Sequence, residues 1–155
     1  MSIFYLDTSA LVKRHIAEIG SAWINALLDP SAAHTIIIAE ITQVEAAAAI
    51  AARHRASGGI SRQERDDAVD LLAVHCTTEY RLVGTNPAIL DRAVHLTQTH
   101  RLRGYDAVQL ATALVANEQY VAAGLASLIF LTADNDLILA ARAEGLAVDN
   151  PNLHP

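Results

Sequence analysis

The stretch Tyr5-Leu6-Asp7-Thr8-Ser9-Ala10-Leu11-Val12-Lys13 decides the fold. An apolar, β-favouring run over residues 3–6 ends abruptly at Asp7, two hydroxyl residues and a helical pattern, so the sequence predicts a strand followed by a helix. Open α/β sheets bind ligands at the carboxyl ends of their strands, which makes Asp7 a candidate ligand-binding residue. On this stretch alone, capping of the helix by Asp7 or by one of the hydroxyl residues is the simpler explanation.

Two further apolar runs resemble the first. Residues 35–39 are continuously apolar and β-branched, as in a strand covered on both faces, and residues 128–131 precede Thr132-Ala133-Asp134-Asn135-Asp136. Short strands are also expected over 80–83 and 146–148, and helices over 9–15, 16–28, 40–55, 61–76, 87–100, from Gly104 to about 122, and 137–144. Strands that alternate with helices predict an α/β fold whose parallel strands end at one shared edge.

Composition sets limits on the class of protein. A chain of 155 residues that is 52% hydrophobic is expected to form a single domain, over residues 1–155, with a substantial core. The single Cys76 excludes an internal disulfide and a thiolate metal site. No apolar run approaches the ~20 residues of a membrane span and no leader pattern is present, so a soluble cytoplasmic protein without a membrane partner is predicted. The net charge of −6 argues against indiscriminate phosphate binding, although bound cations would reverse the charge of an acidic site.

Acidic residues recur where the predicted strands end or where a helix faces them. Glu45 lies in an alanine-rich helix, Asp106 in the first turn of another, and Asp134 after the strand over 128–131. Each has a simpler explanation, respectively a solvated helix flank, an interaction with the helix dipole and a helix cap. Our hypothesis is that Asp7, Glu45, Asp106 and Asp134, with Asp136 as a candidate fifth, converge on one pocket. Crowded carboxylates need cations, and hard oxygen ligands without His or Cys suit Mg²⁺ or Mn²⁺.

Several segments of the sequence, in this order, resemble those of a known family. They are the opening stretch over residues 5–13, Glu45 in its alanine-rich helix, Tyr105-Asp106-Ala107-Val108-Gln109-Leu110-Ala111-Thr112-Ala113, Thr132-Ala133-Asp134, and Glu144-Gly145-Leu146-Ala147-Val148-Asp149-Asn150-Pro151. Over essentially its whole length the chain resembles the PIN domain family, and in particular the VapC-type toxins of bacterial and archaeal toxin-antitoxin systems. The resemblance implies a three-layer domain with a central parallel sheet of four to five strands flanked by helices.

The resemblance also implies an activity, a metal-dependent endoribonuclease. Asp7, Glu45, Asp106 and Asp134 match the four acidic positions of the family and would bind metal and carry catalysis, whereas Thr8 and Asp136 match less regular supporting positions. One ion would activate a water that attacks phosphorus in line, and a second ion, where present, would stabilise the leaving oxygen. By analogy the products are a 5′-phosphate and a 3′-hydroxyl.

Partners follow from the same resemblance. VapC-like proteins are usually homodimers that a VapB-like antitoxin holds inactive, with its tail in the acidic groove, and an arginine of that tail would suit the carboxylates. Four arginines around Gly58-Gly59 are candidates for contact with RNA or antitoxin, the alternative being a solvated surface. They are Arg53, Arg55, Arg62 and Arg65.

Three other classes of protein share features of this sequence. A haloacid-dehalogenase-type phosphotransferase needs a second Asp two residues after the first, where Ser9 stands. A receiver-like phosphoacceptor domain needs a lysine near its last strand, but the only lysine is Lys13. The alternative retained is a catalytically inactive PIN-like module that binds RNA or protein, because a fold can be kept after its catalytic activity is lost. The presence of all four acids counts against it.

Overall fold

The strands of the protein form one parallel sheet in the computed structural model, in which residues 1–154 are described. In spatial order the strands are β3 (Tyr80–Val83), β2 (Thr35–Ala39), β1 (Ile3–Leu6), β4 (Ile129–Leu131) and β5 (Ala147–Asp149). The central strand β1 pairs in parallel with both β2 and β4, so its four residues are all buried. The expected parallel sheet of four to five strands is confirmed, and the expected domain end at residue 155 lies outside the described residues.

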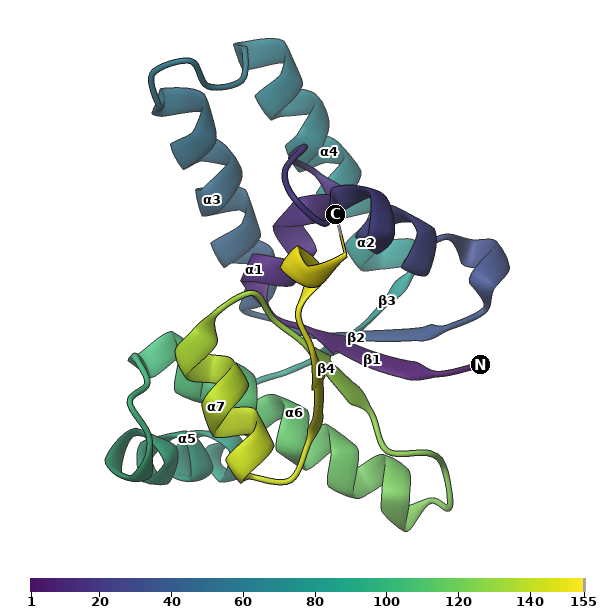
Figure 1. The fold of residues 1–155 in the computed structure, drawn as a ribbon, viewed down its shortest axis with the longest axis vertical. Coiled ribbons are helices and arrows are strands. Elements are labelled where there is room, and N and C mark those ends of the chain that lie inside the picture. Colours follow the sequence, from purple (N-terminus) through teal and green to yellow (C-terminus); the bar gives the residue numbers. More distant parts are fainter. Residues whose placement is uncertain (155) are drawn as a thin grey trace.

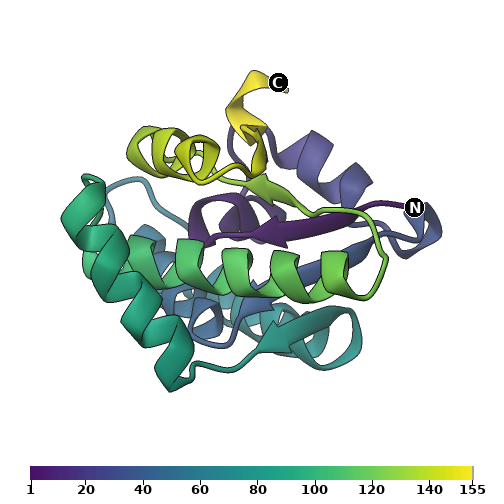
Figure 2. The same ribbon diagram turned by 90° about the horizontal axis from the view of Figure 1, so that it is seen from below.

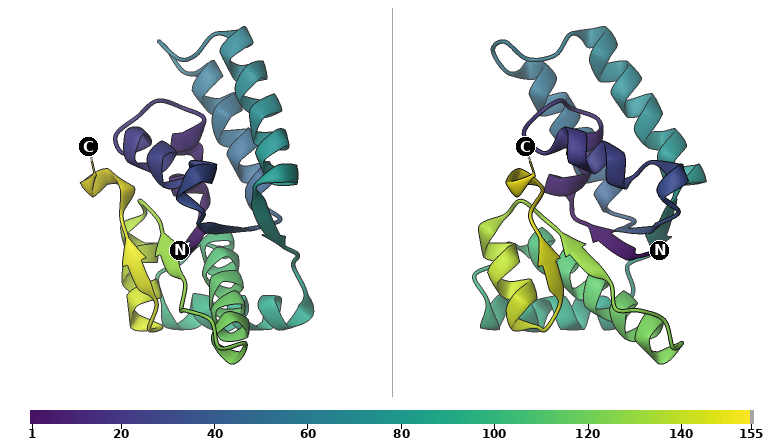
Figure 3. Two further views of the ribbon diagram at one scale, coloured as in Figure 1. Left: turned by 90° about the vertical axis from the view of Figure 1, so that its right-hand side faces the viewer. Right: turned by 45° about the vertical axis from the view of Figure 1, so that its right-hand side comes forward.

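Helices cover both faces of the sheet (Figure 1). Side chains of alternate strand residues point to opposite faces, so that Tyr5 and Phe130 pack against α5 (Pro87–Thr99), α6 (Gly104–Ala122) and α7 (Asn135–Ala143). Phe4 and Leu6 pack against α1 (Thr8–Leu11), α2 (Ser21–Leu27), α3 (Thr42–Arg55) and α4 (Arg62–Thr78). In Figure 2 the long helix α6 crosses in front of the strands, and both views in Figure 3 show the helices on the two sides of the sheet. Within residues 1–154 there are also three short 3₁₀ turns, at Val12–Arg14, Pro30–Ala32 and Pro151–Leu153.

Helices α3 and α4 form a hairpin that projects from the sheet (Figure 1). Its tip requires glycine, because Gly58 has a φ of +66° and a Cβ on Gly59 would lie 1.9 Å from the carbonyl oxygen of Arg53. The predicted capping box starts α4, since the Ser61 hydroxyl accepts from the Glu64 amide while the Glu64 carboxylate accepts from the Ser61 amide.

The expected helices over 9–15 and 16–28 were wrong in their boundaries. The first is only α1 followed by a 3₁₀ turn, and the second begins at Ser21 after Gly20, whose φ is +85°. Lys13 explains the interruption, because its buried ammonium donates to the Ile19 carbonyl oxygen at 2.8 Å and to Glu18 at 2.9 Å. These bonds close the intervening segment into a loop.

The buried face of α3 was also predicted wrongly. The apolar pattern of the sequence places Ile41, Val44, Ala48 and Ala51 along one face and so predicts that this face packs in the core, but Val44 is 65% exposed and Ala48 is exposed as well. The buried residues are Thr42, Ala46 and Ile50, one turn apart on another side of the helix. In a helix made largely of alanine, periodicity hardly distinguishes one side from another. The face that is buried places Glu45 beside the sheet edge.

Among residues 1–154, no helix combines the length and hydropathy that a membrane crossing requires.

We predict that His15 makes the fold sensitive to acid. Burial, and secondarily the neighbouring His75, lowers the pKa of His15 from 6.5 to about 4, and within residues 1–154 neither ring nitrogen has a hydrogen-bond partner. The unfolded chain therefore takes up a proton first as the pH falls below 6.5, so stability is lost progressively down to about pH 4. Urea unfolding at pH 7.5 and 4.5 should show a smaller loss for His15→Phe than for wild type. Equal losses in the two proteins would contradict this assignment.

Candidate functional site: an acidic cavity at the sheet edge

A cavity of about 330 Å³ opens at the carboxyl ends of β1 and β4. Asp7 follows β1, Glu45 comes from α3, Asp106 from the first turn of α6, and Asp134 immediately precedes α7. The structure thus brings four acids from four separate segments of the chain to one cavity, as the convergence hypothesis expected. The remaining lining residues are Thr8, Ser9, Val12, Ala49, Arg103, Tyr105 and Gln109.

Asp7 is the most rigidly held of the four acids. Its carboxylate accepts hydrogen bonds from the Ala10 amide at 2.9 Å, from the Ser9 hydroxyl at 2.8 and 2.9 Å, and from the Thr132 hydroxyl at 2.7 Å. Asp7 is therefore the N-cap of α1 as well as a residue of the cavity. With Asp7 assigned to the metal site, the sequence leaves the cap chiefly to Thr8 or Ser9, and this expectation was wrong because the Asp7 carboxylate itself reaches the free amide in the first turn.

The position of Asp7 is electrostatically unfavourable for a carboxylate. Only 5% of the residue is exposed, and this burial raises its pKa from 3.8 to about 6, although the bonds from Thr132, Ala10 and Ser9 act in the opposite direction. The negative charge of Asp134 raises the pKa further. A cation in the cavity would relieve both the desolvation and the repulsion.

Glu45 is fixed by a buried amide. Its Oε2 accepts from the Thr8 hydroxyl and from Gln109 Nε2 at 2.7 Å. Gln109 is 3% exposed, and its Oε1 accepts from the Tyr5 hydroxyl at 2.8 Å. Thr42 completes the network, with its hydroxyl 2.9 Å from Gln109 Nε2. Glu45 is consequently oriented by partners from β1, α1 and α6, and is not a solvated flank.

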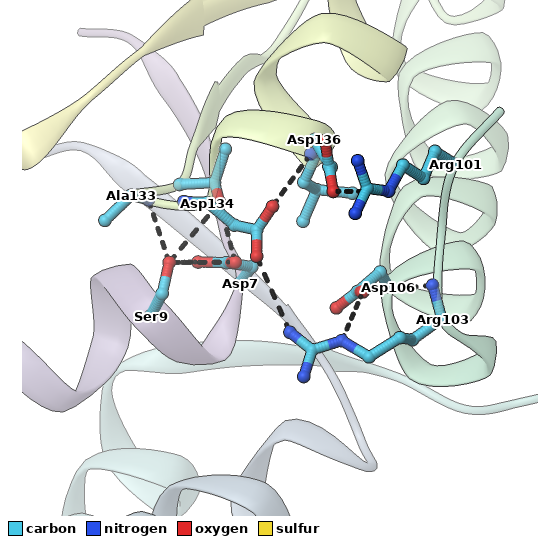
Figure 4. A network of polar contacts seen from close by, with 10 residues as sticks. Asp7, Ser9, Arg101, Arg103, Asp106, Ala133, Asp134 and Asp136 are labelled. Carbon is cyan, nitrogen blue, oxygen red and sulfur yellow. Dashed lines mark hydrogen bonds and ion pairs between the residues drawn. The ribbon is translucent and has the colours of Figure 1, made fainter.

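Asp106 and Asp134 are more accessible and share a basic partner. The exposed fractions of their side chains are 21% and 31%. Arg103 Nε lies 3.2 Å from Asp106 Oδ2, and Arg103 Nη2 lies 3.6 Å from Asp134 Oδ2 (Figure 4). Asp134 also caps α7, since its Oδ1 accepts from the Leu137 amide at 3.0 Å. With the side chains in this arrangement, no group of three or more His, Cys, Asp or Glu within residues 1–154 is placed to hold one metal ion.

The other predicted site residues lie elsewhere. Asp136 lines a neighbouring cavity of about 480 Å³ and is 3.7 Å from Arg101. The four candidate arginines occupy the tip of the α3–α4 hairpin and do not line the acidic cavity. Arg62 and Arg65 approach Asp66 at 3.8 and 2.6 Å, while Arg53 and Arg55 are exposed. A role of these arginines in binding RNA or antitoxin stays a prediction.

Three residues of the site had no role assigned from the sequence. Gln109 follows Asp106 by three residues, a spacing that places both on one side of a helix, so a buried glutamine one turn after a candidate ligand was the available signal. Thr132 begins the stretch Thr132-Ala133-Asp134, which directly follows β4 and was quoted above for its resemblance to the family. Arg103 forms a pair with Arg101 in the sequence for which a solvated surface is the simpler expectation, because nothing in the sequence shows the direction of its side chain.

The chemistry of the donors suits a hard divalent cation. Asp7, Glu45, Asp106 and Asp134 offer only carboxylate oxygens, which are the ligands that Mg²⁺ and Mn²⁺ prefer. Thr8 and Gln109 are neutral donors to Glu45 Oε2, so they leave the negative charge of this carboxylate uncompensated. Burial raises the pKa of the Asp7 carboxyl, and a cation bound beside it would lower that pKa again.

Comparison with known proteins gives consistent results. The family model described as "PIN domain" matches residues 4–143. The chain is 34% identical, over all of both chains, to "Ribonuclease VapC45" of Mycobacterium tuberculosis (strain CDC 1551 / Oshkosh). Among solved structures, VapBC2 from Rickettsia felis bound to a DNA fragment from its promoter aligns with a TM-score of 0.63 and 13% identity, covering 96% of this chain and 98% of that one. VapC20 from M. tuberculosis, described as a sarcin-ricin loop cleaving toxin, aligns with a TM-score of 0.63 and 16% identity, covering 94% and 97%.

We predict that Asp7→Asn stabilises the metal-free protein. In wild type the folded-state pKa of about 6 exceeds the usual 3.8, so stability is greatest below pH 3.8 and is lost as the pH rises through 6. The variant carries no such charge, and its advantage should be up to about 3 kcal/mol above pH 6.5 and should disappear near pH 4. Chemical unfolding in EDTA across this range measures the difference. A variant less stable than wild type at pH 8 would contradict the prediction.

Proposed function

The chain belongs to the PIN domain family, and from this premise we propose that it is a VapC-type toxin, a divalent-metal-dependent endoribonuclease that hydrolyses RNA phosphodiester bonds. The observation that carries the proposal is the gathering of Asp7, Glu45, Asp106 and Asp134 around one cavity at the sheet edge. An inactive binding module would have no need of four acids held at this edge. Residues 1–155 are proposed to act as a single PIN-like domain.

Each residue has a proposed role that follows from its position. Asp7 and Glu45, whose carboxylates are held by fixed partners, would set the position of a Mg²⁺ or Mn²⁺ ion, and Asp106 and Asp134 would complete its ligands from the accessible side. When bound, such an ion supplies Lewis acidity that activates a water and neutralises charge on the phosphate. Thr8 and Gln109 orient Glu45, and Ser9 and Thr132 orient Asp7, so these four are positioning residues. Asp136 is a weaker candidate ligand because it lines the neighbouring cavity.

An antitoxin is the proposed protein partner. The Rickettsia relative is a VapBC complex, so a VapB-like antitoxin is expected to bind this chain and to place a basic tail in the acidic cavity. A homodimer is proposed as well. In its support, α5 exposes Leu90 and Val94, which are 46% and 64% accessible on the isolated chain. The proposed setting is the cytoplasm, where the RNA substrate is found.

We predict that Asp7→Asn and Asp106→Asn each reduce Mg²⁺-dependent cleavage of RNA by more than about 100-fold. Each substitution removes a ligand charge and leaves the core packing in place. Cleavage of total RNA, followed by mapping of the new ends, is the measurement, and EDTA should abolish the wild-type reaction. Asp91→Asn is the matched control, since Asp91 is exposed on α5 and lines neither cavity. Undiminished cleavage by either site variant would refute the assignment.

We also predict that Mn²⁺ or Mg²⁺ protects the protein against heat. A ligand that binds only the folded state at a hundredfold excess over its Kd should raise the Tm by about 5–10 °C for a chain of this size. Asp7→Asn should lose most of this protection and Asp91→Asn none, as measured by calorimetry with and without the metal. Full protection of Asp7→Asn would show that the ion binds elsewhere.

A further inference from the structure

Arg103 places a positive charge inside the acidic cavity. The residue immediately precedes α6, and its backbone amide and its Nε both donate to Asp106 Oδ2 at 3.2 Å. Its Nη2 lies 3.6 Å from Asp134 Oδ2. Figure 4 shows the guanidinium directed toward the space between the two carboxylates, one on α6 and the other at the start of α7. Arg103 is thus a counter-ion shared by two of the four acids.

The contacts of this counter-ion are weak and reversible. The Arg103 side chain is 82% exposed, and both ion-pair distances exceed those of strong charge-assisted hydrogen bonds. Exposed pairs of this kind add little to stability, because solvent and salt screen them. By contrast, Asp7 and Glu45 are held by buried groups, Thr132 and Gln109. Because the Arg103 side chain is so exposed, its guanidinium can leave the cavity without disturbing the core.

A divalent cation ligated by Asp106 and Asp134 would compete with Arg103 for the same oxygens, because two cations repel at such a distance. We propose that Arg103 is an internal counter-ion that the divalent cation displaces, and that the displaced guanidinium then binds a phosphate of the RNA in the neighbouring cavity. The inference rests on the proposed function of the acidic cavity. It adds a substrate-positioning residue and a second binding region to that function.

The neighbouring cavity has the chemistry that the second half of the proposal requires. It shares Arg103, Asp106 and Asp134 with the acidic cavity, and Arg101, Asp136 and His100 are among its other lining residues. His100 is already paired, with its Nε2 2.7 Å from Glu144 Oε1, so the two arginines are the basic groups that a phosphate would meet. The Arg101 side chain is 93% exposed and forms an ion pair with Asp136 at 3.7 Å. A guanidinium matches the geometry of a phosphate, and a groove with basic side chains is the usual means of following a single-stranded backbone. Arg103 can reach either cavity from the same backbone position.

The first test is metal binding by the free protein, in the absence of RNA. Arg103→Gln should bind Mn²⁺ about three- to tenfold more tightly than wild type in calorimetric titrations at low salt, because the ion no longer displaces a competitor. Arg103→Lys keeps the charge and should stay closer to wild type. Arg101→Gln removes a more exposed charge next to the site and controls for long-range electrostatics.

The outcomes of this titration are distinguishable. Wild-type binding with no tightening in Arg103→Gln, or equal tightening in Arg101→Gln, would overturn the counter-ion role and leave the proposed function intact. Failure of wild type to bind Mn²⁺ at all would overturn the proposed metal site, and this inference with it.

The second test concerns the phosphate contact. On an RNA that wild type cleaves, at saturating Mn²⁺, Arg103→Gln should raise KM about fivefold and change kcat less than twofold. Loss of one phosphate contact should also make the slope of log KM against log salt concentration shallower by about 0.7. An unchanged KM and salt slope would overturn the phosphate-binding role.

Discussion

A carboxylate buried at the end of the central strand is the constraint around which the site is built. Asp7 extends the pairing of β1 with β4, because its amide donates to the Leu131 carbonyl oxygen at 3.1 Å. The Thr132 hydroxyl, just beyond β4, then donates to its carboxylate, and Ser9 joins the two segments by donating to Asp7 and accepting from the Ala133 amide at 2.8 Å. These bonds hold the carboxylate in place but do not offset its desolvation, since its pKa remains raised. The negative charge of the site is therefore not fully compensated by the protein, and a bound cation would compensate it.

The four acids differ in the kind of group that holds them. Asp7, which is buried, and Glu45, which is partly exposed, are each bound by a neutral donor from a distant segment, which fixes their direction without removing their charge. Asp106 and Asp134 are compensated by the charge of Arg103 instead. Neutral donors leave the carboxylates of Asp7 and Glu45 available to a metal at all times. The carboxylates of Asp106 and Asp134 become available only when the guanidinium moves, so this pair is the adjustable part of the site.

The residue pattern predicted a parallel sheet and the gathering of the acids, because strand ends in a parallel sheet must share an edge, and the family resemblance implied the three layers. The residue pattern failed where the outcome depends on side-chain direction or on a local tertiary bond. The buried side of α3 was predicted wrongly because alanine lies on every side of that helix. The start of the helix over 16–28 was predicted wrongly because Lys13 closes a loop that the periodicity of apolar residues does not reveal. Gln109 and Arg103 were missed for the same reason. Their roles arise from contacts across the fold, and both residue types are commonly found on solvated surfaces.

The helix-cap and ligand interpretations of these acids, which the sequence left as alternatives, are compatible because a carboxylate has two oxygens. In Asp134, Oδ1 accepts from the Leu137 amide and caps α7, while Oδ2 faces Arg103. In Asp7, Oδ1 accepts from the Ala10 amide and caps α1, while Oδ2 takes the Thr132 hydroxyl. The cap aligns the carboxylate with the start of its helix and so directs the second oxygen toward the sheet edge. A hydroxyl partner can turn its proton away when a cation binds, whereas a backbone amide cannot, so the capping oxygen stays fixed and the other remains free to act as a ligand.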